Sequence, residues 1–397
     1  MTEMLSYEDV WSRTHHFDPP AIFDKLREER PLARMAYPDG HIGWFATSHR
    51  IVREVLSDPR FSHSLEIGHF PVTKYGGPVP QFPAMPGMFI HMDPPDHTKF
   101  RRMLAREFTV RRIAELAPHV ESVAAGQIEE MREHGAPADL LTTFAKPLVL
   151  RVLSDLVGLP YEERERYADA PAITHDPDGD AEESMAVYQQ VGALIGETIE
   201  RKRRQPGDDI ISRLLAAGEL TDEELGNIVA LLLFAGYETT ESALSVGVMA
   251  LLHHPEQLAA LRADLSRVDA AVEEILRYVT VNQYEIFRTA LEDVELDGQL
   301  VKKGETVTVS LPAANRDPAK YGCPAHLDLD RDTAGHLAFG HGIHQCVGQN
   351  LARLELRTGL RALLQAFPDL RAVTPAEEVP LRTRGSVFGL KSLPVAW

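Results

Sequence analysis

The sequence predicts a mainly α-helical protein with a minor β region. Apolar residues recur at helical spacing over most of the 397 residues, whereas alternating, β-branched stretches are short and few. In addition, the apolar stretch Leu225–Leu252 is long enough to run through the middle of a domain. We therefore expect a helical body that carries a small sheet.

The predicted helices follow one another from the N-terminus. Their periodicity places them at Ala21–Arg30, Ser48–Leu56, Asp96–Phe108, Val110–Glu133, Phe144–Leu156 and Met185–Arg204. Two prolines precede the third helix, and Asp96 is its expected N-cap.

The longest predicted helix begins with a capping box, Thr221–Glu224, and ends just before Pro255. About thirty residues at a rise of about 1.5 Å span roughly 50 Å, the breadth of a domain. Its centre nevertheless carries Glu238 and Thr239, which are costly in a buried helix unless they are hydrogen-bonded. We expect the Thr239 hydroxyl to bond to a carbonyl one turn earlier.

The strand signals are confined to three short stretches. His41–Ala46 alternates apolar and polar residues, and Glu305–Ser310 is β-branched. Val294–Val301 contains an Asp-Gly pair that predicts a hairpin turn. The small sheet is therefore expected to combine segments from both ends of the chain.

Composition limits the class of protein. The chain is 44% hydrophobic, and nothing in it resembles a linker, a repeat or a low-complexity block, so we expect one domain over residues 1–397. Two cysteines exclude a disulfide scaffold and fit a reducing cytoplasm. The polar, acidic N-terminus predicts no signal peptide, and no apolar run predicts a membrane span.

Charge argues against nucleic acid as a partner, because the net charge is −18. The basic residues are unevenly distributed, however. One short stretch contains Lys99, Arg101, Arg102, Arg106, Arg111 and Arg112. This stretch is either a solvated helix face or a docking surface for an acidic partner.

Cys346 is the most informative residue of the chain. It lies in the glycine-rich segment Phe339–Gly348, ahead of an apolar helical run from Leu351 to Phe367. A cysteine before a helix favours the thiolate form, and a single thiolate suits an axial ligand to haem iron. A zinc site that uses nearby histidines fits no common ligand spacing. We expect the other cysteine, Cys323, to be a small buried hydrophobic residue.

The segment Phe339–Gly348 matches the pattern Phe-x-x-Gly-x-His-x-Cys-x-Gly, so the chain resembles the cytochrome P-450 superfamily from about Phe45 to Leu393. The closest likeness is to soluble bacterial haem-thiolate monooxygenases of the actinobacterial secondary-metabolite type. The resemblance implies a helical prism with a minor β region, a single haem domain, haem b as cofactor and Cys346 as the iron ligand.

The resemblance also implies roles for other residues. Ala235–Thr240 matches the oxygen-activation motif, which makes Glu238 and Thr239 the expected catalytic residues. Glu274 and Arg277, with Arg331 as third member, match a structural ion-pair motif. The other residues expected at the haem, several of them at its propionates, are His97, Arg101, Arg288, His344, Phe339, Gly340, Ala235 and Gly348.

Substrate and partners are expectations from the same resemblance. The expected pocket residues are Phe89, Ile90, Leu232, Ala235, Thr239, Val281, Asn282, Glu285, Val387 and Phe388. The substrate class implied is a bulky apolar small molecule of macrolide or polyketide type, with a terpenoid, steroid or peptide as alternative. Electrons are expected from NAD(P)H through a ferredoxin reductase and an acidic ferredoxin, which would dock near Arg102, Arg106, Arg111 and Arg112.

Two functions of other classes stay open. One is a haem-binding sensor or carrier without turnover. The other is a peroxygenase or a rearranging haem-thiolate enzyme. The acid and alcohol at Glu238 and Thr239 favour the monooxygenase, because neither alternative needs that proton relay.

Overall fold

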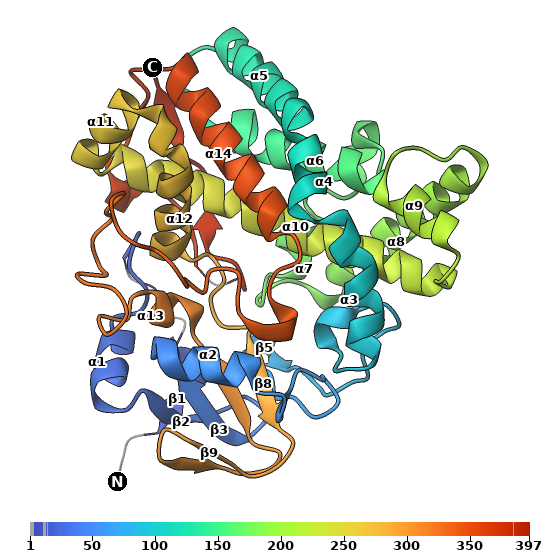
Figure 1. Ribbon diagram of the computed structural model, residues 1–397, viewed down its shortest axis with the longest axis vertical. Coiled ribbons are helices and arrows are strands. Elements are labelled where there is room, and N and C mark those ends of the chain that lie inside the picture. Colours follow the sequence, from blue (N-terminus) through green and yellow to red (C-terminus); the bar gives the residue numbers. More distant parts are fainter. Residues whose placement is uncertain (1–3, 11–12, 14, 384) are drawn as a thin grey trace. The chain divides into compact units, whose positions relative to one another are not determined.

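The computed structural model describes residues 4–10, 13, 15–383 and 385–397 (Figure 1). Helices make up most of these residues, and the strands are short. The predicted class, mainly α with a minor β region, is confirmed. Within the described residues every helix falls short of the length and apolar character needed to span a membrane.

The described chain forms two compact units. The first contains residues up to 83, 246–346 and 374–391, and the second contains 84–245, 347–373 and 392–397. Each unit is assembled from segments far apart in sequence. That the chain functions as one haem domain over residues 1–397 stays a prediction.

The first unit is built around a six-stranded sheet in the order β1-β2-β3-β11-β8-β4. Its strands are Leu5–Ser6, Leu32–Ala36, Ile42–Ala46, Thr306–Val309, Phe287–Ala290 and Phe61–Ser62, in that spatial order. β3 and β11 pair in parallel, with Trp44 opposite Val307, so the expected joining of distant segments is observed. The hairpin β9–β10, Val294–Leu296 and Gln299–Val301, turns at Asp297 and Gly298, both with positive φ.

Helices of the first unit pack beside this sheet. α2, His49–Ser57, begins at Ser48, whose hydroxyl accepts a hydrogen bond from Ile51 N. Its buried side chains join those of the strands in one apolar core. The other helices are α1 Ile22–Glu29, α11 Pro255–Ala263, α12 Val268–Val279 and α13 Leu311–Asn315, and the short hairpins are β5–β6, Thr73–Lys74 with Gly77–Pro78, and β13–β14, Leu381–Arg382 with Gly389–Leu390.

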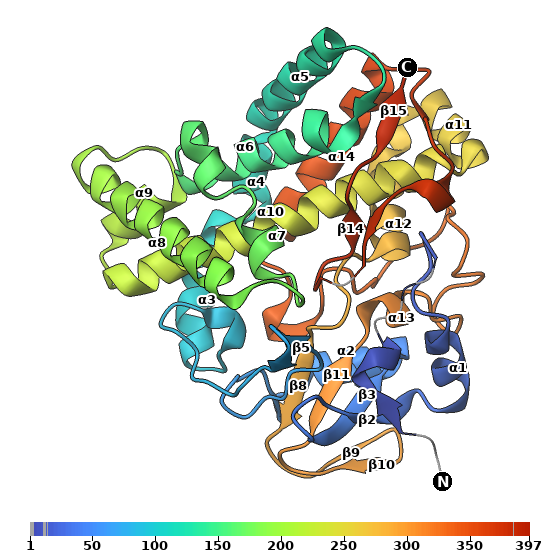
Figure 2. The same cartoon turned by 180° about the vertical axis from the view of Figure 1, so that it is seen from behind.

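The second unit is almost entirely helical. Its helices are α3 Asp96–Glu107, α4 Val110–Glu115, α5 Ala117–His134, α6 Lys146–Val157, α7 Ala170–Thr174, α8 Ala181–Arg204, α9 Ile210–Ala217 and α14 Gln349–Ala366. α14 packs against α5 and α6 (Figure 2). A three-stranded sheet, β12 Arg371–Ala372, β15 Pro394–Ala396 and β7 Ala138–Asp139, completes the unit.

Several predicted boundaries differ from the observed ones, each for a local reason. The helix predicted over 110–133 is broken at Leu116, because Pro118 occupies the first turn of a new helix. α8 begins four residues earlier than Met185, where Asp180 accepts from Glu183 N. Asp96 is the first residue of α3 and not its N-cap, which is Pro95 without a side-chain bond.

α10, Asp222–Leu252, contributes residues to both units. The predicted capping box is present. Thr221 Oγ1 accepts from Glu224 N at 3.1 Å, and Glu224 Oε2 accepts from Thr221 N at 2.8 Å. This reciprocal pair fixes the start of a helix whose apolar side chains, such as Leu233 and Val246, are fully buried.

A pair of stacked imidazoles in the first unit predicts a pH dependence of stability. His41 and His69 lie face to face at 3.6 Å, and His41 Nε2 accepts from Thr306 N at 3.1 Å. Burial, followed by the charge of His69, lowers the pKa of His41 from 6.5 to about 4, although Asp39 and Glu305 oppose the shift. At a pH between these two pKa values, His41 is protonated in the unfolded chain and neutral in the folded protein.

We expect this contribution to stability to be complete above about pH 6.5 and to be lost as the pH falls toward about 4. His41→Gln keeps an acceptor for Thr306 N but does not titrate. The difference in unfolding temperature between wild type and His41→Gln should therefore change across this pH range. His134→Gln, at the exposed end of α5, is the control. Parallel curves for all three proteins would contradict the prediction.

Candidate active site

A tight loop in the first unit presents Cys346. The Cys346 amide donates to Phe339 O at 2.9 Å, and Gln345 N donates to Gly342 O at 3.1 Å. Gly340 and Gly342 have positive φ, and a Cβ at Gly342 would collide with the backbone carbonyl of Leu56. The loop is thus fixed by backbone contacts, with the thiol of Cys346 half-buried and outside any disulfide.

Two cationic or donor side chains lie in the same unit as Cys346. Arg288, buried on β8, donates from Nη1 to Phe287 O at 2.7 Å. The His344 ring meets His63 edge to face at 5.0 Å, and His63 meets Phe287 at 5.6 Å. His63 and Phe287 therefore connect the two predicted donors, His344 and Arg288.

The other two predicted donors lie on α3 in the second unit. His97 is buried, and its ring lies 6.1 Å from that of Phe89. Arg101 follows one turn later and is half-buried. The segment before α3 is attached to α10, because Asn227 Nδ2 donates to Pro86 O at 2.8 Å and Lys99 pairs with Glu224 at 2.6 Å.

The centre of α10 combines a small exposed residue with a hydroxyl and an acid. Ala235 is exposed and Thr239 half-buried, although most of their neighbours on the helix are buried. Thr239 Oγ1 donates to Ala235 O at 2.7 Å, as the sequence pattern indicates, and the helix continues without a break. Because this hydroxyl donates its hydrogen bond to Ala235 O, its lone pairs are left to accept a hydrogen bond from another group.

Glu238 is the acid of this group, and sequence reasoning missed its partner. The carboxyl is 4% exposed, and Oε2 lies 2.8 Å from Nδ1 of His175. His175 follows directly after α7, 63 residues earlier in the chain. No spacing or composition signal in the sequence singles out this histidine.

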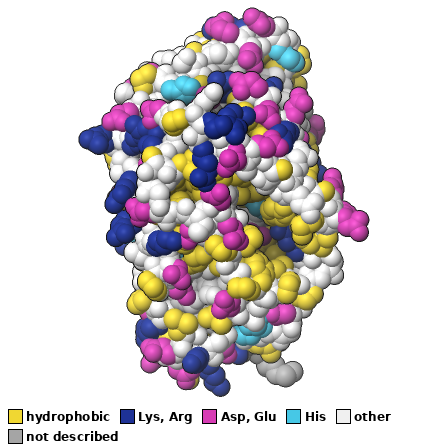
Figure 3. All heavy atoms as spheres, turned by 90° about the vertical axis from the view of Figure 1, so that its right-hand side faces the viewer, with side chains coloured by type: hydrophobic (Ala, Val, Ile, Leu, Met, Phe, Trp, Pro, Cys, Tyr) yellow, Lys and Arg dark blue, Asp and Glu magenta, His cyan; other side chains and the backbone are white. Residues whose placement is uncertain are grey.

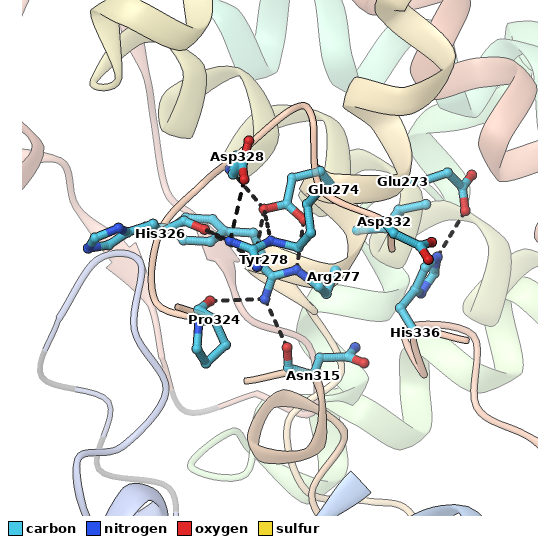
Figure 4. A network of polar contacts seen from close by, with 12 residues as sticks. Glu273, Glu274, Arg277, Tyr278, Asn315, Pro324, His326, Asp328, Asp332 and His336 are labelled. Carbon is cyan, nitrogen blue, oxygen red and sulfur yellow. Dashed lines mark hydrogen bonds and ion pairs between the residues drawn. The ribbon is translucent and has the colours of Figure 1, made fainter. Parts of the chain in front are cut away.

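A buried ion-pair network underlies the cysteine loop (Figure 4). Glu274 and Arg277, both fully buried on α12, are joined by two hydrogen bonds of 2.7 Å, and Arg331 Nε donates to Glu274 at 3.2 Å. Arg277 Nη1 also donates to Asn315 O, and the Asn315 amide oxygen accepts from Leu337 N at 2.7 Å. The network therefore extends to the residues that immediately precede Phe339.

The predicted pocket residues fall into two sets. Phe89, Ile90, Leu232, Ala235 and Thr239 belong to the second unit. The first unit contains Val281, Asn282, Glu285, Val387 and Phe388. In this second set, Asn282 bridges to Val387, and Phe388 N donates to Val281 O at 2.7 Å.

Phe388 has no exposed surface, because the guanidinium of Arg13 covers its ring at 3.6 Å. Burial and the nearby charge of Arg316 lower the pKa of Arg13 to about 9. Glu285, in the same set, is half-buried. Phe388 is thus fully buried, whereas Glu285 keeps some exposed surface.

The basic stretch is less uniform than its sequence suggests. Arg112 pairs with Asp208 at 2.7 Å and with Glu115 at 3.3 Å, and the bond to Asp208 raises its pKa. Arg102, Arg106 and Arg111 are exposed and form no ion pair with other described residues. Figure 3 shows Lys and Arg side chains gathered along one edge of the face that it draws.

Cys323 corrects an expectation. It was expected to be buried, but its side chain is exposed. The residue has a positive φ, and its carbonyl accepts from Arg331 Nη2 at 3.1 Å, so its backbone and not its thiol serves the fold.

The residues present fit a haem with one protein ligand. The thiol of Cys346 is accessible, buried or half-buried cations are available for propionates, and Ala235 leaves an accessible gap in the side chains of α10. Among the described residues, no group of three or more His, Cys, Asp or Glu side chains could hold a metal ion. His336, one of the histidines considered for zinc, instead pairs with Glu273 at 2.9 Å.

The ion-pair network yields the first prediction for this region. Glu274→Ala leaves Arg277 buried without its carboxylate, which costs about 3–5 kcal/mol. We expect a lower unfolding temperature and a low haem content after purification. Glu295→Ala, which removes an exposed glutamate of the same unit, is the matched control. Equal melting curves for both variants and wild type would show that the network does not support the fold.

Comparison with known proteins gives a consistent result. A family model described as Cytochrome P450 matches residues 171–396. The chain is 42% identical to Cytochrome P450 105C1 of a Streptomyces species, over 97% of both chains, and 40% identical to Vitamin D3 dihydroxylase of Streptomyces griseolus, over 97% of this chain and 96% of that one. The solved structure of CYP105P1 in complex with filipin I superposes with a TM-score of 0.93 at 37% identity, covering 100% of this chain and 99% of that chain.

Proposed function

This chain belongs to the cytochrome P450 family of haem monooxygenases, and from that premise we propose that it inserts one oxygen atom from O2 into a C–H or C=C bond of a bulky apolar metabolite. The observation that carries the proposal is the pairing of two features. One is the glycine-fixed loop that presents Cys346, and the other is the acid and alcohol at the centre of α10. A sensor or carrier has no need for the second feature.

Several residues are suited to hold haem. Cys346 Sγ would bind the iron, and Phe339 and the glycines would shape the loop that presents it. His97, Arg101, Arg288 and His344 would donate to the propionates. When bound through a thiolate, haem supplies the oxygen chemistry.

Glu238 supplies protons in this scheme, and Thr239 accepts a hydrogen bond from the group that delivers them. The Thr239 hydroxyl donates its hydrogen bond to Ala235 O and can accept another with its lone pairs. It therefore orients a water or a protonated acid and does not itself act as the acid. Glu238 is buried and carries the proton to this hydroxyl. Electrons come from NAD(P)H through a ferredoxin reductase and a ferredoxin.

The substrate proposed is a large, mostly apolar natural product of macrolide or polyketide type. One relative is named Vitamin D3 dihydroxylase, and one similar solved structure is a complex of CYP105P1 with filipin I. The segment between β4 and α3 fits such ligands, because Ile67, Tyr75 and Phe82 are exposed in it, and Figure 3 shows apolar side chains gathered on the molecular surface. A terpenoid, steroid or peptide is the alternative substrate.

Ligation by Cys346 is tested by spectroscopy of the carbon-monoxide complex of the reduced protein. Wild type should show the long-wavelength Soret band from which the family takes its name, and Cys346→Ser should lose it. Cys323→Ser, which alters the exposed cysteine, should keep it. A wild-type spectrum typical of histidine ligation would refute the assignment, and a thiolate spectrum without oxygenation of any ligand would favour the sensor or carrier.

The ferredoxin surface is tested by charge reversal. Arg102→Glu with Arg106→Glu should slow reduction by ferredoxin several-fold at low salt, because charge attraction mainly raises the association rate. Added salt should slow the wild type and hardly affect the variant, since screening lengths are about 8–10 Å at moderate ionic strength.

The matched control is Lys302→Glu with Lys303→Glu, which makes the same change in net charge at an exposed turn of the first unit. Stopped-flow reduction across a salt series measures all three proteins. If the two double variants show the same rates and salt slopes, the ferredoxin docks elsewhere.

A further inference from the structure

His175, the hydrogen-bond partner of Glu238, has no role in the proton transfer proposed for Glu238 and Thr239. Within the second unit, Nδ1 of His175 lies 2.8 Å from Oε2 of Glu238, which is hydrogen-bonding distance. The glutamate is 4% exposed, whereas the histidine side chain is 25% exposed. One end of this pair is therefore buried beside Thr239, and the other reaches solvent.

The backbone around His175 holds the ring in this position. His175 N donates to Pro171 O at the end of α7, and the following turn closes through Gly179 N to Asp176 O. The ring also packs against Phe234, one turn before Glu238 on α10, with centroids 6.0 Å apart. His175 is thus placed by its own turn and by one face of α10.

The titratable and charged groups around His175 come from three elements. α10 presents Glu238, and α8 contributes Tyr188, whose ring lies 5.5 Å from Phe234. The turn itself contains Asp176, Asp178 and Asp180, of which Asp176 accepts from Asp178 N and Asp180 caps α8. The carboxylates of Asp176 and Asp180 are thus hydrogen-bonded within the turn, and Glu238 is the acid that contacts the ring.

We propose that His175 is the positioning residue that supplies Glu238 with protons from solvent, a role that rests on the proposed function. The imidazolium transfers its Nδ1 proton along the hydrogen bond to Glu238 Oε2, which leaves a neutral ring and a neutral carboxylic acid. The acid turns and releases that proton toward Thr239, and becomes a carboxylate again. While the carboxyl is turned away, Nδ1 is open to water and takes up the next proton.

A histidine suits this task because its charge ordinarily changes between about pH 5 and 8.

The test measures product formed per NAD(P)H consumed, from about pH 5.5 to about pH 8.5. In wild type this ratio should fall as the pH rises, because the relay takes up its protons from solvent. His175→Gln keeps a neutral donor to Glu238 and cannot relay a proton, so its ratio should be low and independent of pH. His119→Gln is the matched control, because it breaks a similar pair, His119 with Asp155 at 3.0 Å, on another helix of the same unit.

A second measurement, which requires no turnover, tests the contact between His175 and Glu238 directly. In the carbon-monoxide complex of the holoenzyme, the hydrogen-bonded Nδ1 proton of His175 should give a protected downfield proton NMR signal. His175→Gln and Glu238→Gln should both remove this signal, and His119→Gln should keep it.

The outcomes separate the two claims. If His175→Gln forms as much product per NAD(P)H as wild type at every pH, the inference about His175 is wrong and the proposed function stands. If the NMR signal is absent from wild type, the pair does not form and the inference is also wrong. Loss of the thiolate spectrum or of all oxygenation in wild type would instead overturn the proposed function.

Discussion

The ion pair of Glu274 and Arg277 is the constraint on which the site in the first unit depends. Two fully buried charges are stable only when their hydrogen bonds are complete, and here they are completed by the loop that contains Pro324 and by the backbone of Asn315. Asn315 in turn holds Leu337, just before the cysteine loop. The position of Cys346 thus follows from satisfying a buried charge some seventy residues earlier in the chain.

α10 illustrates the same principle around Glu238 and Thr239, which belong to the second unit. The helix is apolar enough to be core, yet its centre carries an acid and hydroxyls that cost free energy when buried. Thr239 lowers that cost within the helix by bonding to Ala235 O, whereas Glu238 requires a partner from outside it. The chemistry of the site and the stability of the helix therefore depend on the same contacts.

The sequence predictions were accurate where a feature depends on residues that are close together along the chain. The capping box at Thr221, the hairpin turn at Asp297 and the boundaries of α1, α2 and α10 were predictable, because each depends on residues within one or two turns. The break at Leu116 was missed, although Pro118 was a visible signal for it.

The sequence by itself determined the helical class and the family, and it predicted the roles of the Cys346 segment and of Glu238 with Thr239, because these patterns consist of residues that are adjacent along the chain. Only the tertiary structure decided that His175 meets Glu238, that Arg112 forms an ion pair with Asp208, and that Arg13 covers Phe388. These contacts join residues from distant elements. Since periodicity and spacing report only on one element at a time, no pattern in the sequence specifies which side chains such elements bring together.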